Sequence, residues 1–251
     1  MPRFFIGDHS ISGEKMIIRN PESRHIFNVL RLRVGDVINT FDGKGSEYVA
    51  LIEKASALAI EARIIEEKKI DTEPSCGIVL FQGFLKSQKM DFVVEKCTEI
   101  GICKIIPLIT ERTIVEIKET YADKQMHNRL FRWGRIAQSA SKQSGRLKVP
   151  EIMMPMTFNE ALKEKTDLSF IAWELEKKKG IKQILANKDI LKIKEIGIFI
   201  GPEGGFTKEE VGKAVHEGVM SVTLGQRILR SETSGMVMSA IILHEIESLK
   251  I

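Results

Sequence analysis

The chain has 251 residues, of which 43% are hydrophobic and 29% are charged, a composition too apolar for a disordered protein and ordinary for a globular one. Its three cysteines, Cys76, Cys97 and Cys103, form no CxxC pair, which argues against a disulfide framework or a structural zinc site and favours a reducing compartment. The five histidines share no metal-ligand spacing. No apolar run approaches the roughly 20 residues that span a bilayer, and the N-terminus meets a charge too early for a signal peptide. We therefore expect a soluble, cytoplasmic protein that needs neither a metal nor a membrane.

The net charge of +4 is mild, but the basic residues are unevenly distributed. Residues 1–72 contain 11 Lys or Arg and 11 Asp or Glu, whereas residues 118–148 contain eight against two. A smaller cluster in the first segment, opposed only by Glu22, comprises Arg19, Arg24, His25, Arg31 and Arg33. Two basic patches favour contacts to a polyanion such as a nucleic acid. A solvated helix face fits the same charge pattern equally well.

Residues 1–70 are expected to form a small β-barrel that closes its own sheet edges. A hairpin is predicted by residues 36–41 and 47–52, which flank the turn Asp42-Gly43-Lys44-Gly45. Residues 58–65 alternate apolar and polar side chains as a further strand would, and residues 25–30 are predicted to form a short helix. The charged stretch 66–74, which ends in Pro74, is interpreted as a linker.

After Pro74, apolar strands alternate with helical segments, which is typical of an α/β fold with a mostly parallel sheet between helices. The expected strands are residues 77–81, 104–109, 168–173, 196–200 and 219–224. Apolar residues recur at helical spacing from Met90 to Ile100 and stop at Gly101, which suits a C-terminal cap. Thr207 and Glu210 form a capping-box pattern that opens a further helix.

Two glycine-containing loops directly follow predicted strands. The first, residues 200–206, is neither a P-loop nor a dinucleotide fingerprint, because Gly-Lys-Ser/Thr and GxGxxG are both absent. Ligands of open α/β sheets bind outside the carboxyl ends of strands, so three glycines there favour a binding loop over a simple tight turn. The second loop, residues 224–233, enters a long helix with Ser231 as the expected N-cap. Capping explains neither Gly225 nor Arg227 and Arg230, because positive charge is unfavourable before a helix N-terminus.

The two loops, GPEGGF at 201–206 and LGQRILRSETS at 224–234, resemble the signature of the SPOUT-class RNA methyltransferases. More narrowly, the chain resembles the bacterial 16S ribosomal RNA (uracil-N3)-methyltransferase family over nearly its whole length. HIFNVLRLRVGD at 25–36 is similar to that family's PUA-like RNA-binding domain. KMDFVVEKCTEIGICKIIPLITERT at 89–113 and RWGRIAQSASKQSGR at 132–146 are similar to its catalytic domain. The resemblance implies a PUA-like β-barrel over residues 1–70 and a SPOUT methyltransferase domain with a deep trefoil knot over residues 75–251.

The resemblance also implies an S-adenosylmethionine pocket made from three loops. The implied cofactor-binding residues are Glu174, Ile200, Gly201, Glu203, Gly204, Gly205, Leu224, Gly225, Ile228 and Leu229. The resemblance and the basic patches together also predict a set of RNA-binding residues. These are Arg24, His25, Arg31, Arg33, Arg112, Arg132, Lys142 and Gln143. One departure is Ser234, where relatives commonly have alanine, and we expect this difference to be neutral.

The implied reaction is S-adenosylmethionine-dependent methylation of N3 of a specific uridine in the 16S ribosomal RNA of the small subunit. Uracil N3 carries a proton within the Watson–Crick edge, so the base must be unpaired or flipped out, and that proton must leave. Arg230 or Arg146 is expected to stabilise the developing uracil anion. Glu232 is a candidate to accept the proton, although a Glu in the first turn also serves as a helix-dipole partner.

Two other functions fit parts of the sequence. One is a non-catalytic RNA-binding factor of ribosome assembly, which the intact glycine loops disfavour. The other is a SPOUT methyltransferase that acts on another RNA position, such as a tRNA 2′-hydroxyl, which the N-terminal barrel and the Gln143–Arg146 stretch disfavour.

The last predicted helix, from Met236 to Leu249, is apolar almost all round over its first half, with only Ser239 breaking the run to Leu243. A surface helix shows one apolar stripe, so this segment needs cover on two sides. Burial within a monomer would provide that cover, and so would a partner subunit. The resemblance favours a homodimer, because relatives dimerise through this helix and the one near residues 89–101.

Overall fold

The computed structural model describes residues 3–7, 10–69, 72–114, 124–186, 188–189 and 192–248. Its chain divides into two compact units. The N-terminal unit is Met1–Glu73 together with Ser141–Val149, and the C-terminal unit is Pro74–Ala140 together with Pro150–Ile251. The division at Glu73 falls within the predicted linker. Residues 141–149, however, pack with the N-terminal unit, whereas the sequence assigns them to the domain at 75–251.

The N-terminal unit contains a six-stranded sheet in the order β1-β4-β5-β6-β3-β2. Its strands are β1 (Arg3–Phe5), β2 (Ile11–Ser12), β3 (Lys15–Arg19), β4 (Val37–Phe41), β5 (Glu47–Ala55) and β6 (Ala59–Lys68). The predicted hairpin is confirmed, because β4 and β5 pair antiparallel with Phe41 opposite Glu47. The Asp42 carboxylate closes the turn by accepting hydrogen bonds from the amides of residues 44–46. Strands β1–β3 escape individual prediction; β1 and β2 have only three and two residues.

The short helix predicted at 25–30 is confirmed as one helical stretch, made of α1 (Glu22–Arg24) and the π-helix η1 (His25–Val29). Apolar residues on alternate positions of the strands build the core of this unit. Met16 and Ile18 of β3 are buried, for example, while their neighbours along the strand are exposed. This alternation is what a sheet with one solvated face requires.

Residues 141–149 belong to the N-terminal unit because their polar groups are satisfied there. Arg146 donates to the Glu73 carboxylate at 2.5 Å, and both side chains are nearly buried, with 4% and 14% of their surface exposed. The Leu147 amide donates to the Thr72 hydroxyl at 3.1 Å, and the Val149 amide donates to the Gly43 carbonyl at 3.0 Å. The residues that follow helix α3 (Lys124–Ser144) therefore complete the N-terminal unit.

Replacing Arg146 by methionine is expected to lower the free energy of unfolding by about 3–5 kcal/mol, because it removes the cation that offsets a nearly buried carboxylate. Arg63→Met is the matched control, since Arg63 pairs with Glu53 at 2.9 Å with almost half of each side chain exposed. That change should cost at most about 1 kcal/mol. Urea denaturation of both variants measures the difference, and equal losses would contradict a structural role for Arg146.

The C-terminal unit contains a seven-stranded sheet in which all the pairs of strands are parallel. Its order is β10-β8-β7-β12-β11-β13, with β9 also paired to β8. The strands are β7 (Gly77–Gly83), β8 (Lys104–Ile109), β9 (Glu151–Ile152), β10 (Met156–Thr157), β11 (Leu168–Ala172), β12 (Glu195–Ile200) and β13 (Met220–Val222). The five predicted strands and the α/β class are confirmed. The trefoil knot stays a prediction.

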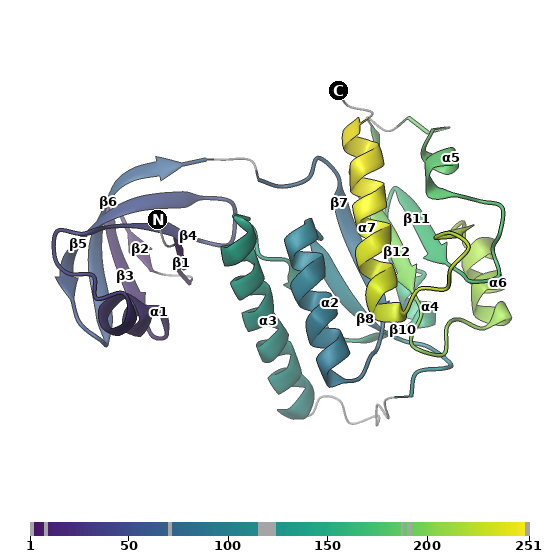
Figure 1. Cartoon of the computed structure of the whole chain (residues 1–251), viewed down its shortest axis with the longest axis horizontal. Helices are drawn as coiled ribbons and strands as arrows, with labels where there is room; N and C mark the ends of the chain where they lie inside the picture. Colours follow the sequence, from purple (N-terminus) through teal and green to yellow (C-terminus); the bar gives the residue numbers. More distant parts are fainter. Residues whose placement is uncertain are drawn as a thin grey trace. The chain divides into compact units, whose positions relative to one another are not determined.

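Helices cover both faces of this sheet (Figure 1). Besides α3, they are α2 (Ser87–Ile100), α4 (Phe158–Ala161), α5 (Ile181–Leu185), α6 (Lys208–His216) and α7 (Ser231–Ser248). Helix α2 ends, as predicted, at Gly101, whose φ of 116° lies in the left-handed region that favours glycine. Helix α6 begins with the predicted capping box between Thr207 and Glu210. Among the described residues, no helix is long and apolar enough to cross a membrane.

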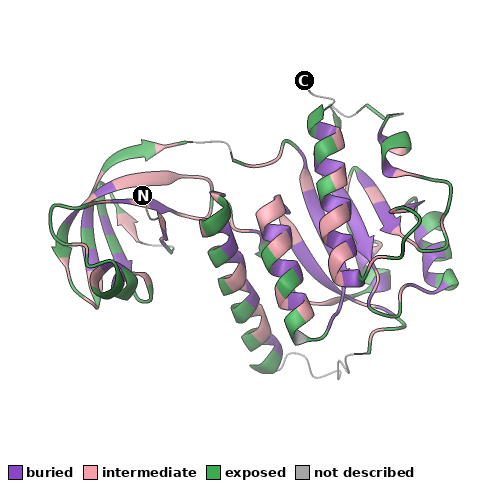
Figure 2. Cartoon of the chain, in the orientation of Figure 1, coloured by how far each residue is buried: buried purple, intermediate pink, exposed green. Residues whose placement is uncertain are grey.

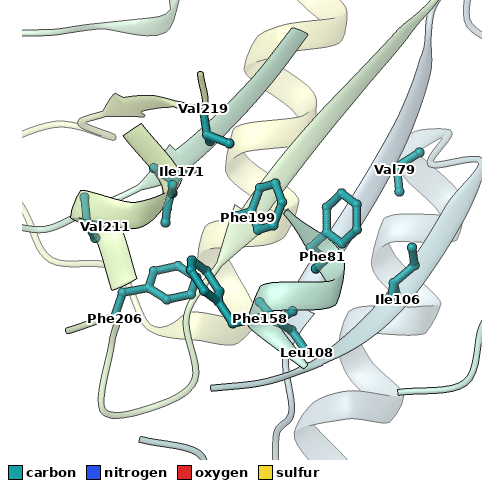
Figure 3. Close-up of a cluster of buried hydrophobic side chains, with 12 residues drawn as sticks. Val79, Phe81, Ile106, Leu108, Phe158, Ile171, Phe199, Phe206, Val211 and Val219 are labelled. Atoms are coloured by element: carbon teal, nitrogen blue, oxygen red, sulfur yellow. The ribbon is translucent and has the colours of Figure 1, made fainter. Parts of the chain in front are cut away.

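The two faces of the sheet pack against different helices. Phe81 and Phe199 stack with ring centres 4.3 Å apart, and Phe158 of α4 and Phe206 pack with them, in a cluster that also includes residues of α6 (Figure 3). On the opposite face, β7 packs against α7, and α2 lies beside α7. Strands β7 and β12 are buried along almost their whole length (Figure 2), which explains their continuous apolar sequences.

Candidate functional site

A cavity of about 540 Å³ lies where β11, β12 and β13 end. It is lined by Lys89, residues 172–174, residues 200–206, residues 223–232 and Ser234. The carboxyl ends of parallel strands are the usual place for a ligand site in such a sheet. All ten residues predicted to bind the cofactor line this cavity, as do Arg230 and Glu232 of the three predicted catalytic residues. Arg146, the third, lies in the N-terminal unit paired with Glu73.

The loop from Gly201 to Phe206 turns back tightly on itself. A Cβ on Gly201 would lie 3.0 Å from the carbonyl carbon of Gly205. A larger residue at position 201 would therefore push the beginning and the end of the loop apart. Gly205 itself has a φ of +69°, and a Cβ on it would meet the Glu174 carboxylate at 3.3 Å. The glycines are therefore needed for the path of the loop and for the close approach of the turn that carries Glu174.

Arg112 supports this loop from outside the cavity. Its guanidinium donates a hydrogen bond to the Gly204 carbonyl at 2.9 Å, and a Cβ on Gly204 would lie 3.1 Å from the Arg112 Cβ. The neighbouring Glu111 amide donates to the carboxylate of Glu210 at 2.9 Å. The turn after β8 thus holds the glycine loop. The sequence predicts Arg112 as an RNA contact, and the structure gives its side chain this additional role.

Ser231 connects three parts of the site. Its hydroxyl accepts a hydrogen bond from the Gln82 side-chain amide at 2.9 Å and donates one to the Gly201 carbonyl. The expected N-cap role of Ser231 is therefore wrong: the amide of Ser234 donates instead to the carbonyl of Arg230, and the hydroxyl of Ser231 is engaged elsewhere. The sequence could not show this, because Gln82 lies 149 positions away on β7.

The turn after β11 is held by Glu176. The backbone amide of Lys178 and the hydroxyl of Ser221 donate to its carboxylate and hold the pKa of Glu176 below its usual range. These hydrogen bonds are present above the ordinary pKa of a Glu and are lost as the pH falls through the lowered value. They help to fix the turn that carries Glu174.

Three charged side chains meet in the cavity. The Lys89 ammonium lies 3.1 Å from Glu203 Oε1 and 3.7 Å from Glu232 Oε2. Exposure falls from 38% for Lys89 to 23% for Glu203 and 13% for Glu232, so Glu232 is the most deeply placed of the three. Its Oε2 is buried without a hydrogen-bond partner in the part of the chain that the structure describes. The sequence gives no signal for Lys89, which α2 brings in from more than 110 residues away.

The predicted RNA-binding residues are divided between the two units. Arg24, His25, Arg31, Arg33, Lys142 and Gln143 lie in the N-terminal unit, and Arg112 and Arg132 lie in the C-terminal unit. Arg33 packs over the Phe27 ring at 4.5 Å and donates to the Phe27 carbonyl. Lys142 is paired with Glu22, and Arg132 with Asp91. Lys118, Glu119 and Asp123 of the basic segment lie outside the described residues, as does Leu249 of the last predicted helix.

No group of three or more potential metal ligands occurs among the residues that the structure describes. The thiol of Cys97 is buried in α2, and burial raises its pKa to about 12. This side chain therefore contributes packing rather than chemistry.

Comparisons with known proteins agree with this geometry. The chain matches the family model of an RNA methyltransferase domain over residues 72–243 and that of an RNA methyltransferase PUA domain over residues 18–65. It is 30% identical to ribosomal RNA small subunit methyltransferase E of Bacillus subtilis over 247 residues, covering 96% of this chain and 91% of the relative.

Two solved structures are similar over nearly the whole chain. Ribosomal RNA small subunit methyltransferase E from Neisseria gonorrhoeae, bound to S-adenosyl methionine, superimposes with a TM-score of 0.84 at 33% identity, covering 97% of both chains. A methyltransferase from Legionella pneumophila in complex with its bound cofactor superimposes with a TM-score of 0.85 at 27% identity, covering 96% of both chains. With its PUA-type N-terminal domain and its glycine-loop cavity, the chain belongs to the RNA methyltransferase family that includes ribosomal RNA small subunit methyltransferase E.

Proposed function

We propose that this protein methylates N3 of a uridine in the 16S ribosomal RNA of the small subunit, with S-adenosylmethionine as the methyl donor. The observation that carries the proposal is the cavity at the carboxyl ends of β11–β13, which joins two glycine loops to a deeply placed carboxylate, Glu232. The name of the relatives supports the choice of ribosomal RNA, and we propose a cytoplasmic location because it fits such a substrate.

The lining of the cavity suits S-adenosylmethionine in its chemistry. Ile200, Leu224 and Leu229 supply apolar walls, and a Cβ on Gly225 would meet nothing within 4 Å, so the second loop leaves room for a ligand beside its backbone. The carboxylates of Glu174 and Glu203 suit a ligand with cationic groups. When bound, the cofactor supplies a methyl group already activated by a positively charged sulfur, so the protein must mainly position the acceptor in line.

The residues of the chain itself then handle the proton and the charge of the acceptor base. The N3 proton passes to the Glu232 carboxylate, the electron pair left on N3 bonds to the methyl carbon, and the pair of the broken carbon–sulfur bond stays on sulfur. Arg230 offsets the negative charge that develops on the uracil ring. We assign this role to Arg230 rather than Arg146, because Arg230 lines the cavity, while Arg146 is buried against Glu73.

RNA recognition belongs, in this proposal, to basic residues of both units. Arg24, His25 and Arg31 lie on or just after the helical stretch of the PUA-type domain. Arg31 has a φ of 57°, a left-handed conformation that is uncommon for a residue with a side chain. These basic residues position the RNA through its phosphates, while the cavity selects the base.

Nucleoside mass spectrometry tests the proposed function. Small subunits from a strain that lacks this protein are incubated with the purified protein and S-adenosylmethionine, and 3-methyluridine is expected as the product. Binding of the subunit without any methylated nucleoside would support a non-catalytic assembly factor instead. A 2′-O-methylated product would support the alternative methyltransferase position.

We also propose that the protein is a homodimer. Helix α7 packs against α2, α5, β7 and β12. On another side, Val237 and Ile241 are only half-buried and Ala240 is exposed, which leaves an apolar stripe that a second copy would cover. The stripe lies on the helix that begins at the cavity, so dimerisation and cofactor binding are expected to be linked.

Val237→Glu is expected to convert the dimer to a monomer and to weaken cofactor binding, because a charge would be buried at the interface. Val215→Glu provides the matched control, since Val215 is a half-exposed valine on α6. Light scattering at micromolar concentration and calorimetry with S-adenosylmethionine measure the two effects. A wild-type protein with a monomer mass and full activity would contradict the proposal.

A further inference from the structure

The geometry of the charged side chains points to a means of selecting the base. Lys89 and Glu232 stand side by side in the cavity, with the ammonium nitrogen 3.7 Å from Glu232 Oε2. That separation is longer than a hydrogen bond, and Oε2 has no other partner among the described residues. The direct hydrogen bond of Lys89 goes instead to Glu203, at 3.1 Å. The pair therefore places one donor group beside a largely buried carboxylate whose Oε2 has no hydrogen-bond partner among the described residues.

We propose that Lys89 and Glu232 together recognise the Watson–Crick edge of uracil and exclude cytosine. This inference rests on the proposed uridine methylation. Uracil presents an oxygen acceptor, O4, beside the N3–H donor. Lysine only donates hydrogen bonds and an ionised carboxylate only accepts them, so Lys89 matches O4 and Glu232 matches N3–H. Cytosine presents the opposite order, an amino donor beside an N3 acceptor. The amino donor of cytosine would then face the Lys89 donor, and its N3 acceptor would face the Glu232 acceptor.

The protein needs such a selection because cytosine is chemically competent. Its N3 has a free electron pair and no proton, so it could accept a methyl group without any base. Shape cannot exclude it either, because the two pyrimidines are almost the same size. A hydrogen-bonding site discriminates strongly when its own groups would be left unpaired, by up to about 10⁴-fold, whereas an apolar pocket does not.

The arrangement around Lys89 keeps its donors aimed at the base. Of its three N–H groups, Glu203 takes one, which anchors the side chain to the glycine loop and leaves the others available. Glu232 is the less exposed partner, and a partly desolvated acceptor loses more when it faces another acceptor. Glu203 is thus an anchor for Lys89, whereas Lys89 and Glu232 contact the base.

The inference is tested with in vitro transcribed small-subunit RNA that carries either uridine or cytidine at the methylated position. For each enzyme, kcat/KM is measured on both RNAs by nucleoside mass spectrometry, and affinity for S-adenosylmethionine is measured by calorimetry. Lys89→Met is expected to lower kcat/KM on the uridine RNA by about 10- to 100-fold and to lower the preference for uridine over cytidine by a similar factor. Calorimetry on the same variant separates this effect from any loss of cofactor binding. Lys89→Arg should restore part of the preference, because it keeps a charged donor.

Glu232→Gln gives a second, independent readout. The glutamine amide can donate as well as accept, so Glu232→Gln should lower the preference for the uridine RNA over the cytidine RNA in equilibrium binding, a quantity that does not depend on the proton transfer. Lys163→Met is the control, because Lys163 is an exposed lysine beyond α4. It should leave the preference for uridine over cytidine unchanged in both measurements.

Each negative result has a distinct meaning. A wild-type enzyme that methylates neither RNA would overturn the proposed function. If the wild type methylates uridine but Lys89→Met keeps the full preference, the recognition by Lys89 is wrong. If Lys89→Met and Glu203→Gln both reduce cofactor affinity and leave the preference unchanged, Lys89 only supports the glycine loop, and the inference is equally overturned.

Discussion

Glu232→Gln will reduce kcat for uridine methylation by about 100- to 10,000-fold at neutral pH, the range expected when a positioned general base is lost. Glutamine has nearly the same shape but cannot accept the N3 proton. Raising the pH should recover part of the lost rate, because more of the uracil is then already deprotonated in solution. Single-turnover kinetics from neutral to alkaline pH measure both effects.

Glu209→Gln is the control for this substitution, because Glu209 is an exposed carboxylate in the first turn of α6. It should leave kcat unchanged at every pH. Calorimetry must show that Glu232→Gln still binds S-adenosylmethionine, so that the loss belongs to the chemical step. A rate within about threefold of the wild type would restrict Glu232 to a helix-dipole role.

Gly83→Ala will disrupt the cofactor site from beneath it. Gly83 ends β7, and a Cβ there would lie 2.2 Å from the Pro202 nitrogen and 2.5 Å from the Gly201 carbonyl carbon. Both are backbone atoms, so the glycine loop itself must move. We expect a loss of about 1–3 kcal/mol in the free energy of unfolding and at least a tenfold loss in affinity for S-adenosylmethionine, a change that corresponds to about 1.4 kcal/mol.

The matched control for Gly83 is Gly212, which lies within α6 with nothing within 4 Å of an added Cβ. Gly212→Ala should stabilise the protein by about 0.5–1 kcal/mol, because alanine is the better helix former. Urea denaturation and calorimetry on both variants provide the comparison. Unchanged cofactor affinity in Gly83→Ala would show that the glycine loop can shift without loss of the site.

Those features that depend on local pattern could be predicted from the sequence. The buried parallel strands follow from their continuous apolar runs, Gly101 ends α2, and the Thr207–Glu210 capping box opens α6. The local pattern predicts each glycine loop separately, the family resemblance implies that both belong to one site, and the cavity brings them together. Strands, caps and turns are determined by residues a few positions apart, so a single sequence contains their signal.

The features that escaped prediction depend on contacts between distant residues. Lys89 reaches the cavity only because α2 packs beside α7, and Ser231 bonds to Gln82 because β7 runs under the start of α7. Arg146 looks like a catalytic candidate in the sequence, since nothing local shows that Glu73 will neutralise it. Side-chain pairing of this kind follows from the strand order, which hydrophobic periodicity does not specify.

The discontinuous N-terminal unit has a consequence for the order of events during synthesis. Its six strands have been synthesised once residue 68 has been made. The hydrogen bonds of Glu73 and Thr72 form only with Arg146 and Leu147, which are translated about 75 residues later. Domains generally fold as units in the order in which they leave the ribosome. Here the first two strands of the methyltransferase sheet, β7 and β8, are made before the PUA-type domain is finished. The domain that is made first is therefore completed only after synthesis of the second has begun, and truncation at residue 73 would leave it without the segment 141–149 that closes it.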